Sequence, residues 1–290
     1  MKKLMTGNEA LVRGAWEAGV NFASAYPGTP STEILENMSG YKEVYSEWAP
    51  NEKVALEAAV GASIAGARSM ASMKHVGLNV AADPLFSFVY QGVNGGMVII
   101  TADEPGQHSS QNEQDNRHYA KAAKLAMMEP SDSQEARAFM KEAFEISEKL
   151  DTPILMRMTT RLCHSKGIVD CGERVEVPAK KYEKNIAKHL NPPAIAKKQR
   201  ILLEDRLVKL KEFSETTPMN RIEDNGKKVG VVVSGMCYCY AKEVFGDDVN
   251  YLKLGFTYPL PSDLIKKFCT GLDIIYVICL LYTSDAADDL

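Results

Sequence analysis

The 290-residue sequence lacks a paired cysteine motif, a long apolar segment and an excess of basic residues. Its six cysteines, at positions 163, 171, 237, 239, 269 and 279, form no Cys-x-x-Cys pair, which disfavours a zinc site or an iron–sulfur cluster on this chain. No stretch has the length of a signal-peptide core or a membrane span, so we expect no membrane association, reduced thiols and a cytoplasmic location. Lys and Arg number 34 against 38 Asp and Glu, which argues against nucleic acid as a partner.

The first 160 residues alternate between strand-like and helix-like segments. We expect helices near 7–18, 31–39, 51–67, 76–92 and 132–149, and strands near 20–26, 43–48, 69–73, 96–101, 125–128 and 153–158. The strands are almost continuously apolar, as in Met97–Ile100, which is typical of a parallel sheet with both faces covered. The sequence therefore predicts an α/β fold with a parallel-sheet domain over residues 1–175.

The remaining sequence divides into three further segments. Residues 176–227 are rich in Pro and Lys and predict a surface connector with a charged helix at about 196–215. Residues 228–278 show a second strand–helix alternation and predict a partial α/β domain. The last segment, 279–290, resembles the translation of a sequencing-library adapter, so we expect a non-native tail there; a natural acidic tail is the alternative.

Polar turns follow several of the predicted strands, and in an open α/β sheet such turns build a ligand crevice. The first is the loop Tyr26–Ser31, in which two prolines and a glycine make a rigid frame that presents the Thr29 hydroxyl. Ser31 or Thr32 could cap the following helix, and the whole segment could also be an ordinary capped turn. The turn that contains His75 and Gly77 follows a later strand, and a satisfied polar histidine is the plain alternative there.

Glu52 lies in the first turn of the helix that begins near Asn51. An acid at this position stabilises the helix dipole, and this is the simple explanation. A carboxylate at a helix start can also exchange a proton with a ring nitrogen of a bound cofactor. Glu57 points to a different face and is the weaker candidate.

A long polar segment, Asp103–Arg117, follows another apolar strand, where groups that recognise a ligand are often placed. His108 is either a ligand contact or a satisfied polar residue. Arg117 could pair bidentately with a substrate carboxylate, or form a salt bridge to Asp115 or Glu113.

The segments 26–31, 51–55, 74–79 and 108–115 resemble those of the thiamine-diphosphate-dependent 2-oxoacid:ferredoxin oxidoreductases, in particular the α subunits that act on indolepyruvate. The resemblance covers almost all of residues 5–278. It implies that the first domain binds the pyrimidine ring of thiamine diphosphate. It also implies that residues 228–278 belong to a domain of the transketolase C-terminal type.

The resemblance assigns roles to individual residues. The family's pyrimidine-domain glutamate stands nine positions before a helix glycine, as Glu52 stands before Gly61. Glu52 would then hydrogen-bond the aminopyrimidine ring and favour the tautomer that deprotonates the thiazolium carbon, which attacks the 2-oxo group. The residues implied to line the cofactor site are Tyr26, Pro27, Glu52, His75 and Gly77, those implied for the substrate are Thr29, His108 and Arg117, and no metal ligand is implied on this chain.

The resemblance further implies an enzyme larger than this chain. The enzyme would oxidatively decarboxylate indolepyruvate and related aryl pyruvates to aryl-acetyl-CoA and reduce ferredoxin, with CoA as co-substrate. A β subunit and ferredoxin would be its partners in a hetero-oligomer. The diphosphate-binding domain with its Mg²⁺ ligands and the iron–sulfur segment have no counterpart here, which predicts an inactive N-terminal fragment truncated near residue 278. Alternatives are another 2-oxoacid:ferredoxin oxidoreductase, a thiamine-dependent decarboxylase subunit, or a non-catalytic interaction module with the same fold.

Overall fold

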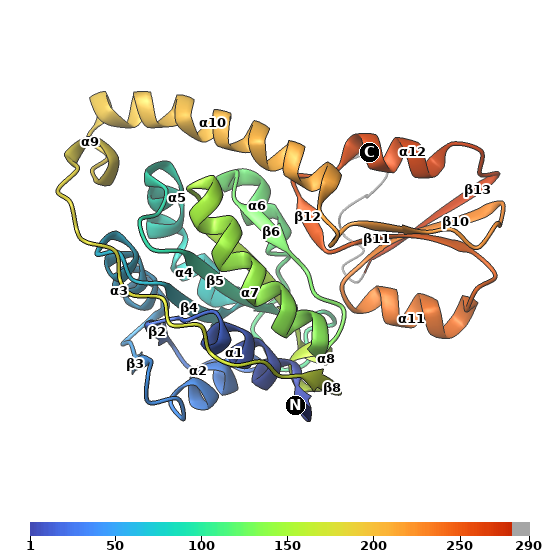
Figure 1. The fold of residues 1–290 in the computed structure, drawn as a ribbon, viewed down its shortest axis with the longest axis horizontal. Coiled ribbons are helices and arrows are strands. Elements are labelled where there is room, and N and C mark those ends of the chain that lie inside the picture. Colours follow the sequence, from blue (N-terminus) through green and yellow to red (C-terminus); the bar gives the residue numbers. More distant parts are fainter. Residues whose placement is uncertain (280–290) are drawn as a thin grey trace.

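The computed structural model describes residues 1–279, which form three sheets and the helices around them (Figure 1). The strands of the seven-stranded sheet are β2 (Phe22–Ala25), β3 (Tyr45–Trp48), β4 (Ser69–Lys74), β5 (Met97–Asp103), β6 (Ala126–Met128), β7 (Ile154–Thr159) and β12 (Phe256–Tyr258). Its flanking helices are α1 (Gly7–Glu17), α2 (Thr32–Met38), α3 (Glu52–Ile64), α4 (His75–Val80), α5 (Ala82–Gln91), α6 (Arg117–Ala123), α7 (Ser133–Leu150) and α8 (Thr160–His164). A two-stranded ribbon pairs β1 (Lys2–Thr6) with β8 (Lys166–Asp170).

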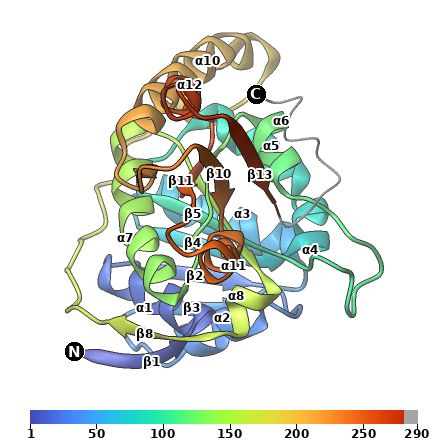
Figure 2. The same cartoon turned by 90° about the vertical axis from the view of Figure 1, so that its right-hand side faces the viewer.

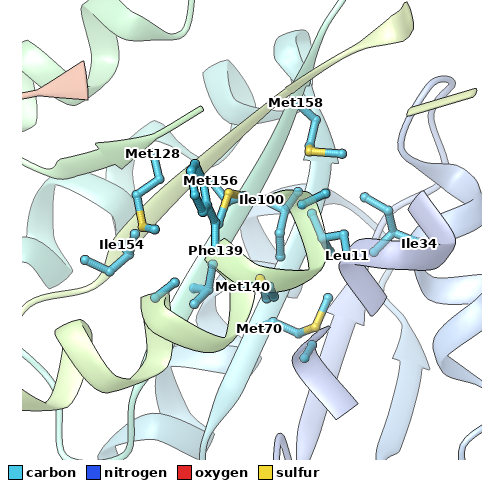
Figure 3. Close-up of a cluster of buried hydrophobic side chains, with 14 of the residues drawn as sticks. Leu11, Ile34, Met70, Ile100, Met128, Phe139, Met140, Ile154, Met156 and Met158 are labelled. Carbon is cyan, nitrogen blue, oxygen red and sulfur yellow. The ribbon is translucent and has the colours of Figure 1, made fainter. Parts of the chain in front are cut away.

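The seven strands lie in the order β12-β6-β7-β5-β4-β2-β3. The six strands from the first 160 residues are parallel to their neighbours, and only β12 is antiparallel. One apolar cluster packs between the sheet and the helices α1, α2 and α7, with strand side chains such as Ile100 and Met156 facing Leu11 and Phe139 (Figure 3). A second cluster covers the opposite face under α3 to α6. The predicted parallel α/β fold is therefore confirmed.

Local sequence explains some of the helix starts. Asn51 and Asp132 cap α3 and α7 by accepting hydrogen bonds from backbone N–H groups in the first turns. The single helix expected over 76–92 is wrong, because the structure has two helices, α4 and α5, that meet at Ala81. Pro84 lies in the first turn of α5, where its missing N–H costs no hydrogen bond, so a new helix can start just before it.

The second sheet has the order β13-β10-β11-β9. Its elements are β9 (Arg221–Glu223), β10 (Val229–Ser234), β11 (Asn250–Leu254), β13 (Ile274–Ile278), α11 (Met236–Phe245) and α12 (Ser262–Cys269), and the connector contributes α9 (Ile186–His189) and α10 (Pro193–Thr216). We call the seven-stranded sheet with its flanking helices the first unit, and the four-stranded sheet with α11 and α12 the second unit. The long helix α10 runs along the first unit toward the second (Figure 1).

The two units exchange strands. β9 precedes residue 228 yet pairs with β11, and β12 follows residue 228 yet pairs with β6 of the large sheet. The buried side chain of Asn220 holds this crossing, because its amide donates to the carbonyl of Phe256 and its oxygen accepts from the N–H groups of Gly255 and Phe256. The domain boundaries at 175, 227 and 278 stay predictions. The predicted tail, 279–290, lies outside the described residues apart from Cys279.

None of the helices in residues 1–279 is both long and apolar enough to cross a membrane. All six cysteines are free thiols.

A buried ion pair joins α7 to β11 of the second sheet. Lys253 is fully buried and donates to Glu135, which also accepts from the backbone and hydroxyl of Ser131. Burial alone would raise the pKa of Glu135, but the Lys253 ammonium and the Ser131 hydrogen bonds hold it below its ordinary value of 4.5.

Acid should weaken this junction. Because the folded-state pKa is lowered, the stabilisation is complete above pH 4.5 and is lost as the pH falls through the folded-state value. The double variant Glu135→Gln/Lys253→Met should therefore lose less stability between neutral pH and about pH 3.5 than the wild type does. Urea denaturation at both pH values measures this, with the exposed Glu212→Gln as control. An equal loss in the double variant and the wild type would refute the prediction.

Candidate functional site

The carboxyl ends of β2, β3, β4, β5 and β7 meet at one edge of the large sheet, because these strands are parallel. Three of the segments singled out from the sequence follow β2, β4 and β5 directly. Glu52 begins α3 after β3. The site residues expected from the sequence are thus carried by one edge of the sheet, where ligands of open α/β folds bind.

Two hydroxyl groups at the end of the loop Tyr26–Ser31 hydrogen-bond to the backbone of Gly28 and hold the loop in a tight turn. The Gly28 N–H donates to Thr32 Oγ1 over 2.9 Å, and Ser31 Oγ donates to the Gly28 carbonyl over 2.8 Å. The expectation that Ser31 or Thr32 caps α2 is wrong, because Gly28 engages both hydroxyls and no side chain caps this helix. The side chains of Tyr26, Pro27 and Thr29 remain exposed, so this loop can present all three to a ligand.

Lys74 connects this loop to the polar segment after β5. A Cβ on Gly28 would lie 2.9 Å from Lys74 Cδ, so the glycine lets the loop backbone rest on the lysine stem. The Lys74 ammonium then donates to Ser110 Oγ over 2.9 Å. Two segments that lie far apart in the sequence are thereby fixed side by side at the sheet edge.

Glu52 is buried in the first turn of α3, with 8% of its surface exposed. Asn51 already caps the helix by accepting from the Val54 N–H. The Glu52 carboxylate has no hydrogen-bond or ion-pair partner within residues 1–279, whereas Glu57 is exposed on another face. Most of the Glu52 side chain is buried, but its two oxygens are not fully enclosed, so a ligand at the sheet edge can reach them and donate a hydrogen bond.

Gly77 lies directly against Glu52. A Cβ on Gly77 would be 2.7 Å from both Cγ and Oε1 of Glu52, closer than real Cβ atoms approach. The absence of a side chain at position 77 is therefore what leaves room for the carboxylate. The structure brings together two of the five residues predicted for the cofactor.

His75, at the start of α4, is fully buried. Its Nε2 lies 2.9 Å from the carbonyl oxygen of Asn112 and must donate, because a carbonyl only accepts. Its Nδ1 is buried and has no partner in the described part of the chain. His75 thus ties the polar segment to α4 and leaves one ring nitrogen unpaired.

Arg117 pairs with Asp115, so the salt-bridge alternative weighed from the sequence is present in the structure. Burial raises the pKa of Asp115, but the Arg117 guanidinium more than offsets this and holds the pKa below its ordinary value. Arg117 and His108 line separate pockets, and the role of each in substrate binding stays a prediction.

Arg157 was missed from the sequence. It lies in β7 and is 3% exposed; its guanidinium donates to Asp103 and Glu129, each over 2.6 Å, and Asp115 Oδ1 lies 3.9 Å away. Burial would lower the pKa of Arg157, but the carboxylates of Asp103, Glu129 and Asp115 raise it above its ordinary value. The sequence does carry a signal for this network, because Arg157 is the one charged residue in the otherwise apolar strand Ile154–Thr159. A charge buried in a strand needs partners of opposite charge nearby.

A family model described as pyruvate flavodoxin/ferredoxin oxidoreductase, thiamine diP-binding, matches residues 13–229. The chain belongs to this family. The resemblance stated from the sequence is confirmed at this level, and so is thiamine diphosphate as the cofactor that the family's domain binds.

Curated relatives and solved structures agree with the oxidoreductase family. The chain is 44% identical to the indolepyruvate oxidoreductase subunit IorA of Archaeoglobus fulgidus, over 96% of this chain and 46% of that protein. It is 26% identical to the 2-oxoglutarate synthase subunit KorA of the same organism, over 95% of this chain and 87% of that protein. A 2-oxoglutarate:ferredoxin oxidoreductase from Magnetococcus marinus shares the fold, with a TM-score of 0.77 at 17% identity over 95% of this chain and 57% of that chain. The chain spans about half the length of the IorA relatives.

The residues of this oxidoreductase-family chain fit one part of the cofactor. The carboxylate of the largely buried Glu52 has no partner in the described part of the chain and can accept from a ring N–H, and the exposed Tyr26 and Pro27 border the same sheet edge. Within residues 1–279, no three His, Cys, Asp or Glu side chains are grouped to hold a metal ion. These residues therefore fit the ring part of the cofactor, an aromatic ring that carries a hydrogen-bond donor.

A methyl group at position 77 should displace Glu52. In Gly77→Ala the new Cβ would overlap Cγ and Oε1 of Glu52, so the carboxylate must move away from its position. We expect the full-length enzyme to lose activity by about 10- to 100-fold, as a displacement near 1 Å can cause. Steady-state kinetics measures this.

Gly61→Ala is the matched control for this substitution. A Cβ at Gly61 meets nothing within 4 Å, and an alanine within α3 should stabilise the protein by about 0.5–1 kcal/mol without loss of activity. Unchanged kinetics in Gly77→Ala would show that the contact does not position Glu52.

Proposed function

We propose that this chain forms the pyrimidine-binding part of the α subunit of an indolepyruvate:ferredoxin oxidoreductase. One observation carries the proposal: the largely buried Glu52, whose carboxylate has no partner within residues 1–279, stands at the sheet edge in a chain that is 44% identical to an IorA subunit. The reaction would be the oxidative decarboxylation of aryl pyruvates to aryl-acetyl-CoA, with electrons passed to ferredoxin.

The residues of the chain would bind and orient the cofactor. Thiamine diphosphate supplies a nucleophilic carbon and an electron sink for decarboxylation of 2-oxoacids. Glu52 would accept a hydrogen bond from a ring nitrogen and hold or release its proton, and the burial of most of its side chain would keep the carboxylate in place. Gly77 leaves space for the carboxylate, and His75 anchors the polar segment beside it.

The substrate would be held by groups of the neighbouring loops. Thr29 presents its exposed hydroxyl from the rigid loop after β2. Arg117 already donates to Asp115 and to Cys279 Sγ, so it would bind the substrate carboxylate by sharing or exchanging such partners. His108 is exposed on the polar segment and would contact the substrate from there.

The proposal places the remaining chemistry elsewhere in the enzyme. The diphosphate and Mg²⁺ sites and the iron–sulfur clusters would lie in the remainder of a subunit of which this chain spans about half. CoA would be the co-substrate, and a β subunit and ferredoxin the partners. The cytoplasmic location remains a prediction.

A substrate panel tests the proposal. The full-length protein and its partner subunit would be assayed for CoA-dependent ferredoxin reduction with indolepyruvate, phenylpyruvate, pyruvate and 2-oxoglutarate. We expect the highest kcat/KM with the aryl pyruvates and no turnover by the 290-residue chain alone. A preference for pyruvate or 2-oxoglutarate, decarboxylation without electron transfer, or turnover by the isolated chain would each contradict it.

A further inference from the structure

A second hollow lies at the same sheet edge and takes no part in the proposed reaction apart from His108. It measures about 460 Å³ and is lined by Pro105 and His108 of the polar segment, by Thr159–Arg161 with His164 and Ser165 around α8, and by Tyr240 of α11. α8 and α11 come from the two different units and lie near each other in both views (Figures 1 and 2). The volume is in the range of pockets that hold small molecules.

Three hydrogen-bond donors that line this pocket have no partner among the described residues. The guanidinium of Arg161 and the imidazole of His108 form no hydrogen bond or ion pair within residues 1–279. The hydroxyl of Thr159, a residue only 6% exposed, is also buried without a partner. A buried hydroxyl in this state costs about 1–3 kcal/mol unless a ligand accepts its hydrogen bond.

The charges around the pocket favour an anion. Arg161 is permanently charged, and His108 and His164 can donate hydrogen bonds from either ring form. The opposing charge is Glu33, whose Oε1 lies 3.6 Å from His164 Nε2. Glu33 engages His164 and also accepts from the Asn8 amide, but it does not pair with Arg161, so within residues 1–279 the Arg161 fork is available to a planar or tetrahedral oxyanion.

We propose that this pocket binds the oxyanion group of a small molecule, a phosphate or a carboxylate, through Arg161, His108, His164 and the Thr159 hydroxyl. Arg161 would make the charge-assisted contact, and Thr159 would donate the buried one. Tyr240 closes the pocket from the second unit, so ligand binding would also bridge the two units. His108 is the one lining residue also proposed for substrate contact; anion binding through Arg161, His164 and Thr159 does not depend on the proposed reaction.

Binding of simple anions to the 290-residue chain tests the proposal without any turnover. The probes are pyrophosphate and malonate, followed by NMR of labelled histidines, of which the chain has five. We expect saturable shifts of His108 and His164 at concentrations around 1–10 mM, with no matching shift of His189 on α9. Tighter binding of pyrophosphate would identify a phosphate source, and tighter binding of malonate a carboxylate source.

Three variants make the test specific. Arg161→Gln should weaken binding by about 10-fold or more, and Thr159→Val should weaken it while the protein stays folded, since the lost hydroxyl has no partner. Lys166→Gln is the matched control, because it removes an exposed positive charge near the pocket that does not line it, and it should change binding less than about 2-fold. No saturable shift, wild-type affinity in Arg161→Gln, or equal weakening by Lys166→Gln would overturn the proposal.

Discussion

Glu52→Gln in the full-length enzyme is expected to lower kcat by about 10²- to 10⁴-fold, the usual contribution of a positioned proton-transfer group. Glutamine preserves the size of the side chain but cannot take up a proton from a ring nitrogen. Because Asn51 already caps α3, the substitution removes no essential helix cap. The measurement is kcat with saturating 2-oxoacid, CoA and cofactor.

Glu57→Gln is the control for this experiment. It changes the same residue type on the same helix, but its side chain is exposed on another face. Activity and cofactor affinity should stay within about 2-fold of the wild type, since exposed substitutions of this kind have small effects. Normal kcat in Glu52→Gln would remove Glu52 from the proposed mechanism.

Arg157→Met should destabilise the protein by about 3–5 kcal/mol, the cost of leaving buried charges without their partner. The arginine neutralises Asp103 and Glu129 beneath the carboxyl ends of the strands, and both carboxylates are almost fully buried. Methionine fills similar volume, so the loss reports the charge rather than a cavity. Urea denaturation measures the change in the free energy of unfolding.

Arg200→Met provides the comparison for Arg157→Met. Arg200 is half-exposed on α10 and pairs with Glu204 one helical turn away. Such a surface pair contributes at most about 1 kcal/mol, so the variant should remain close to the wild type. Equal stabilities of Arg157→Met and Arg200→Met would show that the buried network does not stabilise the sheet edge.

The parallel sheet could be predicted because its strands are short apolar runs separated by amphipathic helices. The exchange of strands between the two units, in which β9 pairs with β11 and β12 pairs with β6, could not be predicted. β12 has only three residues, and its pairing with β6 depends on Asn220, whose hydrogen bonds form only after the two units are in place. Long-range pairing of this kind leaves no periodic signal in the local sequence.

Residues of the candidate site could be predicted from the sequence where the functional side chain lies in the turn that follows a strand. The place of Glu52 at the start of a helix indicated its role, and the structure adds its contact with Gly77 and the absence of a partner within residues 1–279. Arg117 shows the limit, because only coordinates reveal that Asp115 already engages it. Arg161 and Thr159 were not marked, because they become a site only through a pocket built from two units.

The most direct test is exchange of the cofactor's thiazolium C2 hydrogen with deuterium in the loaded full-length protein, followed by NMR after acid quench. Exchange requires no substrate, so it reports what Glu52 does to the cofactor apart from every later step. We predict at least ~100-fold slower exchange in Glu52→Gln and wild-type exchange in Glu57→Gln. Wild-type exchange in Glu52→Gln would contradict the assignment of this carboxylate to the cofactor.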